Sequence, residues 1–415
     1  TNDREPPIQT DPGQTVNYTI SIVNNGRSTS YKNILVDTVP EGMRTTAPAI
    51  TQVTLDGLPL TENTHYLYSW VAGTGQQTFD FHNCPSPTNI PAGSTLVIQY
   101  SGVVDDDVGA GTTLANVSYT TYNPQSADPG RQVDEGDDPN NNNEDDSTIQ
   151  VTNATLVKTH NAAGNTDSIG QPFDYTLSCT VPAHTTIYNS TVTDYMPDGL
   201  EVDGTARTLD GSPTSIGTVS TTYHPGTGIT DVIWDIGDFA NDTDNPRVLA
   251  LIISVHVKDE LHDGSKVDGI PPGQTVFSNT GRIDWDDADS GGTHHFATDS
   301  ADDITAAEPR LVLTKDNNAG GPITGNQVIQ YSITVENSGT AASYQNVVVD
   351  TLPAEMRGNA PTVTSVTLAG VPLTENTDYW VTWNGSSGEL TVDLDHGSSV
   401  TNIVPGSANA LVITY

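Results

Sequence analysis

The stretch that decides the fold is Val16-Asn17-Tyr18-Thr19-Ile20-Ser21-Ile22, in which apolar and polar residues alternate. Because successive side chains of a β-strand point to opposite faces of its sheet, this alternation predicts a strand with one buried face. Close copies occur at 173–179 and 329–335, and an Asp-x-x-Pro signature follows each copy. The copies are spaced by about 157 residues, which indicates one structural unit repeated in tandem.

The length and charge of the chain limit its fold and its partners. Its 415 residues correspond to about three domains of roughly 150 residues each. The 52 acidic and 14 basic residues exclude a protein that binds nucleic acid through phosphate contacts. No apolar run reaches the roughly 20 residues that a membrane helix needs, so no membrane span is expected in this segment.

Short alternating runs separated by glycine- and proline-containing turns continue through each unit, and no segment shows a sustained helical period. We therefore predict an all-β chain of tandem β-sandwich domains. The predicted domains, called repeats 1, 2 and 3 from here on, span residues 1–152, 153–308 and 309–415. Repeat 1 is expected to lack its first strand and repeat 3 its last strands. Either this segment belongs to a longer tandem array, or a neighbouring subunit adds the missing strands.

The run 12–26, followed by 33–43 with its Asp-Thr-Val-Pro-Glu-Gly sequence, resembles the conserved tandem repeat of unknown function of archaeal and bacterial cell-surface proteins. That repeat is similar to the immunoglobulin-like stalk domains of fimbriae and adhesins. The resemblance covers all three repeats. Repeat 2 departs from it with Pro182-Ala183 in place of the Asn-Gly turn, and repeat 3 with Ala354-Glu355 in place of Glu-Gly. The resemblance implies immunoglobulin-like β-sandwich domains in a linear array, in an extracellular, cell-surface location.

The resemblance also implies a candidate crosslink. In stalk domains of this kind, a lysine on the first strand can condense with an asparagine on the last strand, helped by a buried acid. Lys158 and Asn279 occupy such positions in repeat 2, and Asp194 is the candidate acid. A desolvated lysine loses its charge readily, and the neutral amine is the form that attacks an amide. Repeat 1 keeps the asparagine as Asn116 without the lysine strand, whereas repeat 3 keeps Lys315 without the asparagine strand.

Simpler roles are open for the same residues. Lys158 could extend along the end of its strand into solvent, and Asn279 could cap a turn. The recurring aspartates Asp37, Asp194 and Asp350 each precede a proline by three positions. An aspartate before a turn commonly accepts a hydrogen bond from a nearby backbone amide. We therefore interpret these three aspartates as turn residues rather than catalytic groups.

Acidic clusters indicate a second kind of site. They include 105–107, 134–138, 144–146 and 286–289, expected on loops, several of them near repeat junctions. Ca²⁺ takes six to eight oxygen ligands, and a bound ion would stiffen a junction that charge repulsion loosens. The candidate ligands are Asp105, Asp106, Asp107, Asp286, Asp287 and Asp289. None of these runs has the spacing of a known calcium loop, and a solvated acidic surface is the alternative.

Six Asn-x-Ser/Thr triplets are candidate N-glycosylation sites. Their asparagines are Asn17, Asn116, Asn153, Asn189, Asn241 and Asn384. An outward side chain on a strand or at a junction would make modification sterically possible at Asn17, Asn116, Asn153 and Asn384.

No constellation of acid, base and nucleophile emerges, so we expect a protein that is not an enzyme. Repeats that contact mainly their neighbours build a rod whose length grows with copy number. We therefore expect a structural subunit or stalk of an extracellular filament, sheath or surface layer that assembles with copies of itself. The alternative is an adhesin-type module whose tip loops recognise carbohydrate or a partner cell. The aromatic residues to inspect for that role are Tyr66, Tyr68, Trp70, Tyr379, Trp380 and Trp383.

Overall fold

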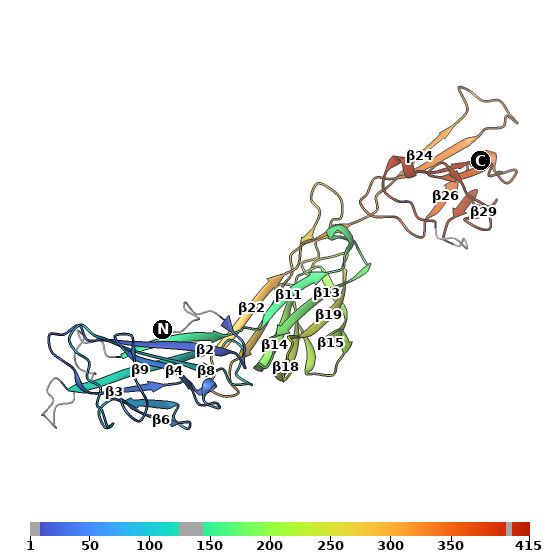
Figure 1. Cartoon of the computed structure of the whole chain (residues 1–415). Helices are drawn as coiled ribbons and strands as arrows, with labels where there is room; N and C mark the ends of the chain where they lie inside the picture. The colour runs from blue at the N-terminus through green and yellow to red at the C-terminus, as the bar shows by residue number, and fades with distance from the viewer. Residues whose placement is uncertain (1–8, 124–143, 396–400) are drawn as a thin grey trace.

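The computed structural model describes residues 9–123, 144–395 and 401–415. Within these ranges the chain consists of strands, turns and short 3-10 helices at 41–43, 163–165, 354–356 and 407–409, with no α-helix. The predicted all-β class is therefore confirmed. No helix in this part of the chain is long and apolar enough to cross a membrane. The strands form three groups that follow one another along an elongated molecule (Figure 1).

Repeat 1 packs a four-stranded sheet, in the order β2-β8-β4-β5, on a six-stranded sheet, in the order β1-β10-β9-β3-β7-β6. The strands are β1 (Gln9–Thr10), β2 (Thr15–Val23), β3 (Tyr31–Thr38), β4 (Ala49–Leu55), β5 (Leu58–Pro59), β6 (Leu67–Val71), β7 (Gln76–Asp80), β8 (Thr95–Val103), β9 (Thr113–Asn123) and β10 (Glu144–Val151). Val16 and Tyr18 of β2 are buried in a core built from both sheets, as the alternation predicts.

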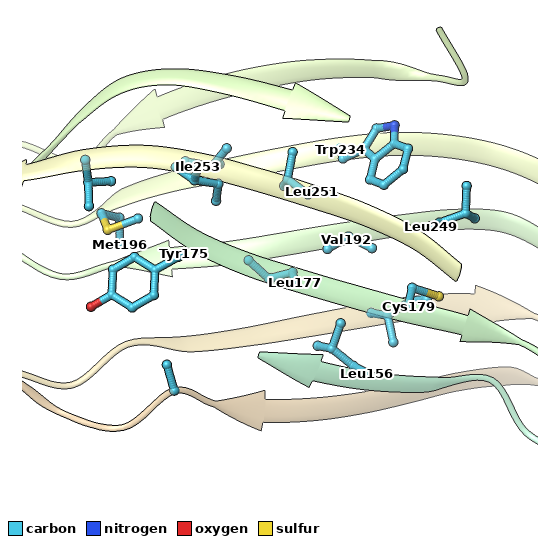
Figure 2. Packing of buried hydrophobic residues seen from close by; sticks show 14 of the residues in the cluster. Leu156, Tyr175, Leu177, Cys179, Val192, Met196, Trp234, Leu249, Leu251 and Ile253 are labelled. Carbon is cyan, nitrogen blue, oxygen red and sulfur yellow. The ribbon is translucent and has the colours of Figure 1, made fainter. Parts of the chain in front are cut away.

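Repeat 2 packs the sheet β11-β13-β19-β15-β16 on the sheet β17-β18-β14-β21-β22, with a small third sheet β12-β23-β20. The strands are β11 (Thr155–His160), β12 (Thr166–Ser168), β13 (Pro172–Val181), β14 (Thr186–Met196), β15 (Leu200–Leu209), β16 (Ser212–Pro213), β17 (Thr218–Tyr223), β18 (Thr230–Ala240), β19 (Arg247–Val257), β20 (Val276–Phe277), β21 (Thr280–Asp286), β22 (His294–Ser300) and β23 (Ile304–Ala307). Figure 2 shows Leu177 and Cys179 of β13 in the core with Val192 of β14 and Trp234 of β18.

Repeat 3 has a sheet in the order β24-β25-β31-β27-β28 and a sheet in the order β26-β30-β29. The strands are β24 (Leu311–Asn317), β25 (Tyr331–Asn337), β26 (Val347–Thr351), β27 (Ser365–Leu368), β28 (Val371–Pro372), β29 (Trp380–Asn384), β30 (Glu389–Asp393) and β31 (Leu411–Thr414). Its core again combines both sheets.

The strand orders show how the repeats correspond. The run β2-β8-β4-β5 of repeat 1 matches β13-β19-β15-β16 of repeat 2 and β25-β31-β27-β28 of repeat 3. Repeats 2 and 3 add an edge strand, β11 or β24, which pairs with β13 or β25. Among the described residues, repeat 1 has no strand that corresponds to β11, and repeat 3 has none that corresponds to β9 or β21.

The acidic run 144–146 corrects one expectation. These residues were expected on a loop, but they form the start of β10 and pair with β9. Their side chains are exposed, so the strand tolerates three successive charges at its end. The cluster 134–138 lies outside the described residues.

Backbone contacts join repeats 1 and 2. Gly109 forms an isolated bridge with Thr186, and the Asp107 amide donates a hydrogen bond of 3.1 Å to the His184 carbonyl. The Trp285 indole nitrogen donates a hydrogen bond of 2.9 Å to the Ala110 carbonyl. The junction is thus packed and hydrogen-bonded rather than spanned by a loose linker.

Candidate crosslink site

Lys158 lies on the inward face of the edge strand β11. The strand alternates exposed and buried residues, so Leu156 and Lys158 point toward the core. Lys158 pairs with Leu177 of β13 in the antiparallel register, and its side chain has no exposed surface. A buried ammonium group is costly unless a partner compensates it.

Asp194 of β14, in the opposite sheet, is that partner. Its Oδ2 atom lies 2.5 Å from Lys158 Nζ, and the Asp194 side chain is also fully buried. On the neighbouring β18 the residue paired with Asp194 is the apolar Val232. The other carboxylate oxygen, Asp194 Oδ1, has no hydrogen-bond partner. The ion pair is therefore fully buried, and one oxygen of its carboxylate is left unsatisfied.

Asn279 completes the cluster. It directly precedes β21, is 1% exposed, and its Oδ1 atom has no hydrogen-bond partner. Gly281, two residues further along the chain, pairs with Asp194. A Cβ atom at Gly281 would lie 2.5 Å from the Leu177 side chain and 3.4 Å from Lys158 Cδ. Glycine at this position therefore leaves room for the lysine side chain between the sheets.

Burial drives both charged groups toward their neutral forms. Desolvation lowers the pKa of Lys158 to about 8, although the Asp194 carboxylate acts in the opposite direction. Burial raises the pKa of Asp194, while Lys158 and Asn279 oppose that shift. A proton transfer along the 2.5 Å contact turns the ion pair into a neutral amine and a neutral carboxylic acid. These are the forms that amide chemistry requires.

The arrangement supports a condensation that balances without any external reagent. In such a condensation the neutral Lys158 amine would attack the Asn279 side-chain carbonyl carbon, while the protonated Asp194 would donate a hydrogen bond or proton to the carbonyl oxygen. The carbon–nitrogen bond of the Asn279 amide would then break. The products would be a Lys158–Asn279 amide bond and one ammonia molecule, with Asp194 protonated again.

The structure contradicts the simpler roles for these residues. Lys158 does not reach solvent, and Asn279 is buried near Met196, with its Nδ2 atom 3.7 Å from the sulfur. Asp194 points into the core rather than onto a turn, and so does Asp37, which is 1% exposed. Asp350 binds Lys315 at 2.6 Å. The turn interpretation is therefore wrong for all three aspartates, because strands β3, β14 and β26 extend through them.

Repeat 1 contains the acid and the amide of the same cluster. Asp37 Oδ2 accepts hydrogen bonds from Gln77 Nε2 at 2.6 Å and from the Tyr100 hydroxyl at 2.7 Å. Asn116 Nδ2 donates to the Tyr100 oxygen, and Asn116 Oδ1 has no hydrogen-bond partner. Gln77 takes the position of Val232, so the acid of repeat 1 is better satisfied than Asp194.

Replacing Asp37 by asparagine is expected to stabilise repeat 1 at pH 8. Burial raises the pKa of Asp37 to about 6 from 3.8, so the folded state binds its proton more tightly than the unfolded state. This group's contribution to stability therefore falls as the pH rises from about 4 to above 6. The neutral side chain removes that deficit, roughly 3 kcal/mol at about 1.4 kcal/mol per pKa unit.

Calorimetric unfolding of both chains at pH 8 and pH 4 checks this, since the gain should vanish at the lower pH. The exposed Asp56→Asn is the control and should show no such gain. An Asp37→Asn chain that is less stable than wild type at pH 8 would contradict the expectation.

Repeat 3 contains the lysine and the acid. Lys315 Nζ lies 2.6 Å from Asp350 Oδ1, and the Tyr415 hydroxyl also donates to Asp350. The Lys315 side chain is 31% exposed, whereas that of Lys158 is fully buried. No described residue of repeat 3 takes the place of Asn279. Repeats 1 and 3 thus hold complementary parts of the cluster that repeat 2 holds complete.

Three of the six candidate calcium ligands, Asp105, Asp286 and Asp287, accept hydrogen bonds from protein groups. Both acidic clusters lie at the junction of repeats 1 and 2. Asp105 accepts hydrogen bonds from the backbone amides of Arg44 and Thr45, and Asp287 accepts one from the Thr293 amide. The hydrogen bond between His294 and Asp286 holds the pKa of this carboxyl group below its usual value. Within the described ranges, no three His, Cys, Asp or Glu residues form a group that could hold a metal ion.

Calcium at this junction, with Asp106, Asp107 and Asp289 as further ligands, stays a prediction. If it binds, adding a chelator at low ionic strength should lower the thermal midpoint of the chain, because the junction would lose a cation that offsets its acidic charge. Calorimetry with and without chelator measures the shift. An unchanged midpoint would contradict the prediction.

Burial separates the candidate glycosylation sites. Asn116 is 4% exposed and points inward, contrary to the outward position expected for it. Asn241 is 1% exposed and donates to three backbone carbonyls, those of Val181, Pro182 and Asn245. The other candidates are exposed or partly exposed: Asn17, Asn153, Asn189 and Asn384. Glycans at these four stay a prediction for glycopeptide mass spectrometry.

The aromatic residues considered for carbohydrate binding lie largely in the cores. Tyr66 and Tyr379 are buried, and the side chains that pack partly buried against the cores are Tyr68, Trp70 and Trp383. Trp380 alone of the six is largely exposed, at 47%. A stacking platform of several exposed rings does not form from these residues, and carbohydrate binding stays a prediction.

No protein-family model and no curated protein matches the sequence. Solved structures that it is similar to include the C-terminal domain of the Streptococcus pyogenes antigen I/II-family protein AspA, at 13% identity and a TM-score of 0.29 over 72% of this chain and 94% of that one. Another is the Bacillus cereus major pilin subunit BcpA, at 10% identity and a TM-score of 0.28 over 91% of this chain and 95% of that one. A third is the Corynebacterium diphtheriae major pilin SpaD, at 12% identity and a TM-score of 0.29 over 90% of this chain and 80% of that one. At these values no function transfers to this chain.

Proposed function

We propose that this chain is a load-bearing segment of an extracellular filament or stalk at the cell surface, and that an amide bond between Lys158 and Asn279 closes repeat 2. The observation that carries the proposal is the buried cluster of Lys158, Asp194 and Asn279. It joins β11 at the edge of one sheet to β14 and β21 of the other. A chain that only needed a stable core would be served as well by apolar residues at these positions.

The position of the bond suits a protein that is pulled from its ends. Lys158 lies near the start of repeat 2 and Asn279 near its end. Tension that enters at β11 would pass through the amide bond to β21 without loading the residues from Thr159 to Ser278. Most of the sandwich would then be protected from unfolding under force.

The composition of the chain also supports a role at the cell surface. A formal net charge of -38 keeps an elongated body soluble and discourages unspecific pairing of strand edges. The three groups of strands in succession (Figure 1) give length rather than a pocketed body. We infer that copies of the chain extend the array in a linear assembly, which electron microscopy of the purified chain would show directly.

Stretching single molecules between terminal handles tests the mechanical role. When fully unfolded, the wild-type chain is expected to have a contour length roughly 400 Å shorter than that of an unlinked chain with the same number of residues. The bond would keep the residues between Lys158 and Asn279 out of the stretched path, and each of them would otherwise add about 3.4 Å. The Asn279→Ala chain should recover this length. A wild-type chain that extends fully would refute the load-bearing bond.

A further inference from the structure

In repeat 1 a pair of facing tyrosines lies beside the buried acid. Tyr18 of β2 pairs with Tyr100 of β8, and their rings stack with centroids 5.1 Å apart. The Tyr18 hydroxyl donates to the sulfur of Met43 at 3.4 Å, whereas the Tyr100 hydroxyl donates to Asp37 Oδ2 at 2.7 Å. A donor at this oxygen favours the ionised acid, so it opposes the rise in the pKa of Asp37 that burial causes.

Repeat 3 combines the same tyrosine pair with a lysine. Tyr331 and Tyr415 exchange backbone hydrogen bonds, and their rings stack with centroids 5.5 Å apart. The Tyr415 hydroxyl donates to Asp350 Oδ2. Lys315 Nζ lies 2.6 Å from Oδ1 of the same acid and 4.5 Å from the Tyr331 ring centroid. A second tyrosine at this position is therefore compatible with a lysine bound to the acid.

Repeat 2 has an isoleucine where the second tyrosine stands in the other repeats. Tyr175 of β13 pairs with Ile253 of β19, both are fully buried, and Figure 2 shows them in the core. Ile253 has no group that can donate a hydrogen bond. Val232, which pairs with Asp194 on β18, has none either. Lys158 binds Asp194 Oδ2, and Asp194 Oδ1 is left without a hydrogen-bond partner.

Two buried acceptor atoms of the cluster thus lack donors, Asp194 Oδ1 and Asn279 Oδ1. Leaving a buried acceptor unpaired is costly. A proton on Asp194 relieves both atoms, because the carboxylic acid then donates a hydrogen bond to the amide oxygen. A tyrosine hydroxyl at the position of Ile253 would remove this advantage, since it would pair with the ionised carboxylate instead.

We propose that Ile253 is a positioning residue of the crosslink site, which acts by withholding the hydroxyl that the equivalent tyrosine gives to the acid in repeats 1 and 3. Asp194 is thereby free to hold a proton and to present it to the Asn279 carbonyl oxygen. The inference rests on the crosslink proposed for repeat 2, and it names what makes the acid of that repeat a proton donor. In repeats 1 and 3 the tyrosine keeps the acid as a hydrogen-bond acceptor.

Ile253→Tyr in the full chain tests this role. The added hydroxyl is expected to slow the loss of ammonia roughly tenfold or more, because a hydrogen bond to a charged group is worth about that factor in an equilibrium. Intact mass at fixed times after cell-free synthesis measures the rate. Ile253→Phe adds the ring without the hydroxyl and should restore the wild-type rate. Loss of ammonia by Ile253→Tyr at the wild-type rate would overturn the proposal, and so would equal slowing by Ile253→Phe.

Val232→Gln tests the same idea without an added ring. In repeat 1, Gln77 occupies this position and donates to Asp37 at 2.6 Å, so the glutamine should also slow the loss of ammonia. Val232→Leu is its control, because repeat 3 has Leu390 there and leucine has no donor. This pair decides the question if the Ile253→Tyr chain does not fold, and equal rates in the two variants would then overturn the proposal.

Infrared spectra at pH 8 detect the proton on Asp194 whether or not the crosslink forms. Asp37, with a pKa of about 6, is ionised at that pH. The band of a protonated carboxylic acid should be present in the wild type, weaker in Ile253→Tyr and unchanged in Ile253→Phe. A wild-type chain with its full calculated mass would refute the crosslink, and the spectra alone would then judge Ile253. Equal bands in the two variants would overturn its role.

Discussion

Replacing Asn279 by alanine is expected to make the chain heavier than wild type by one ammonia, once the mass of the substitution itself is subtracted. If Lys158 and Asn279 condense as proposed, the wild-type chain has lost one ammonia, and the variant has no amide carbonyl to attack. The ion pair of Lys158 with Asp194 remains in the variant, so the fold keeps its buried charges compensated. Intact mass under denaturing conditions gives the answer directly.

The same substitution should destabilise repeat 2 strongly. A covalent link between residues 158 and 279 restricts the unfolded chain, as a disulfide does, and a closed loop of about 100 residues contributes roughly 5 kcal/mol by the chain-entropy estimate. Loss of the buried amide group by itself costs far less, on the order of 1 kcal/mol. The size of the stability loss that calorimetry measures between wild type and Asn279→Ala therefore distinguishes a crosslinked repeat 2 from one held by packing alone.

Asn116→Ala provides the matched control, because it removes a buried asparagine at the same strand position in a repeat whose described residues include no partner lysine. It should leave the mass deficit of the wild type unchanged. Asp194→Ala should abolish the deficit, but it also leaves Lys158 buried without a counter-charge, which costs about 3–5 kcal/mol. A wild-type chain that shows its full calculated mass would end the crosslink hypothesis for repeat 2.

The sequence predicted the all-β class because alternation reports burial directly, whereas the candidate crosslink residues followed from the resemblance to stalk domains. Lys158 and Leu156 share the inward face of β11, and a lysine on that face marks a polar group in the core. The resemblance to fimbrial and adhesin stalk domains is what implied Asn279 and Asp194 as its partners. What alternation does not report is which strands of the two sheets face each other, so the 2.5 Å contact between Lys158 and Asp194 required the three-dimensional structure.

The failures have a common physical origin. Asp37 was assigned to a turn because of the proline that follows it, but β3 continues to Thr38 and carries the aspartate into the core. Asn116 was expected to point outward, whereas β9 presents it to Asp37 and Tyr100. In both cases a polar residue type was taken as a sign of exposure. Buried polar clusters violate that rule, and the recurrence of Asp and Asn at equivalent positions was the signal that could have found them.

Gly109→Ala is expected to loosen the junction between repeats 1 and 2. A Cβ atom at Gly109 would lie 2.0 Å from the backbone carbonyl oxygen of Asp287, and such a contact forces the two segments apart because neither side is a flexible side chain. The bridge to Thr186 and the hydrogen bond from Trp285 to Ala110 depend on the same close approach. We expect both to be lost, while the cores of the two repeats keep their packing.

Small-angle scattering would detect the change as a broader distribution of interatomic distances at an unchanged secondary-structure content, and limited proteolysis should cut the variant faster near residues 105–112. Gly73→Ala is the control, since a Cβ atom there meets no other atom within 4 Å and should leave the scattering as it is. If the Gly109→Ala chain scatters like the wild type, backbone packing at this junction does not hold the repeats in line. The stiffness of the rod would then have to come from another source, of which a cation bound between the two acidic clusters is the testable alternative.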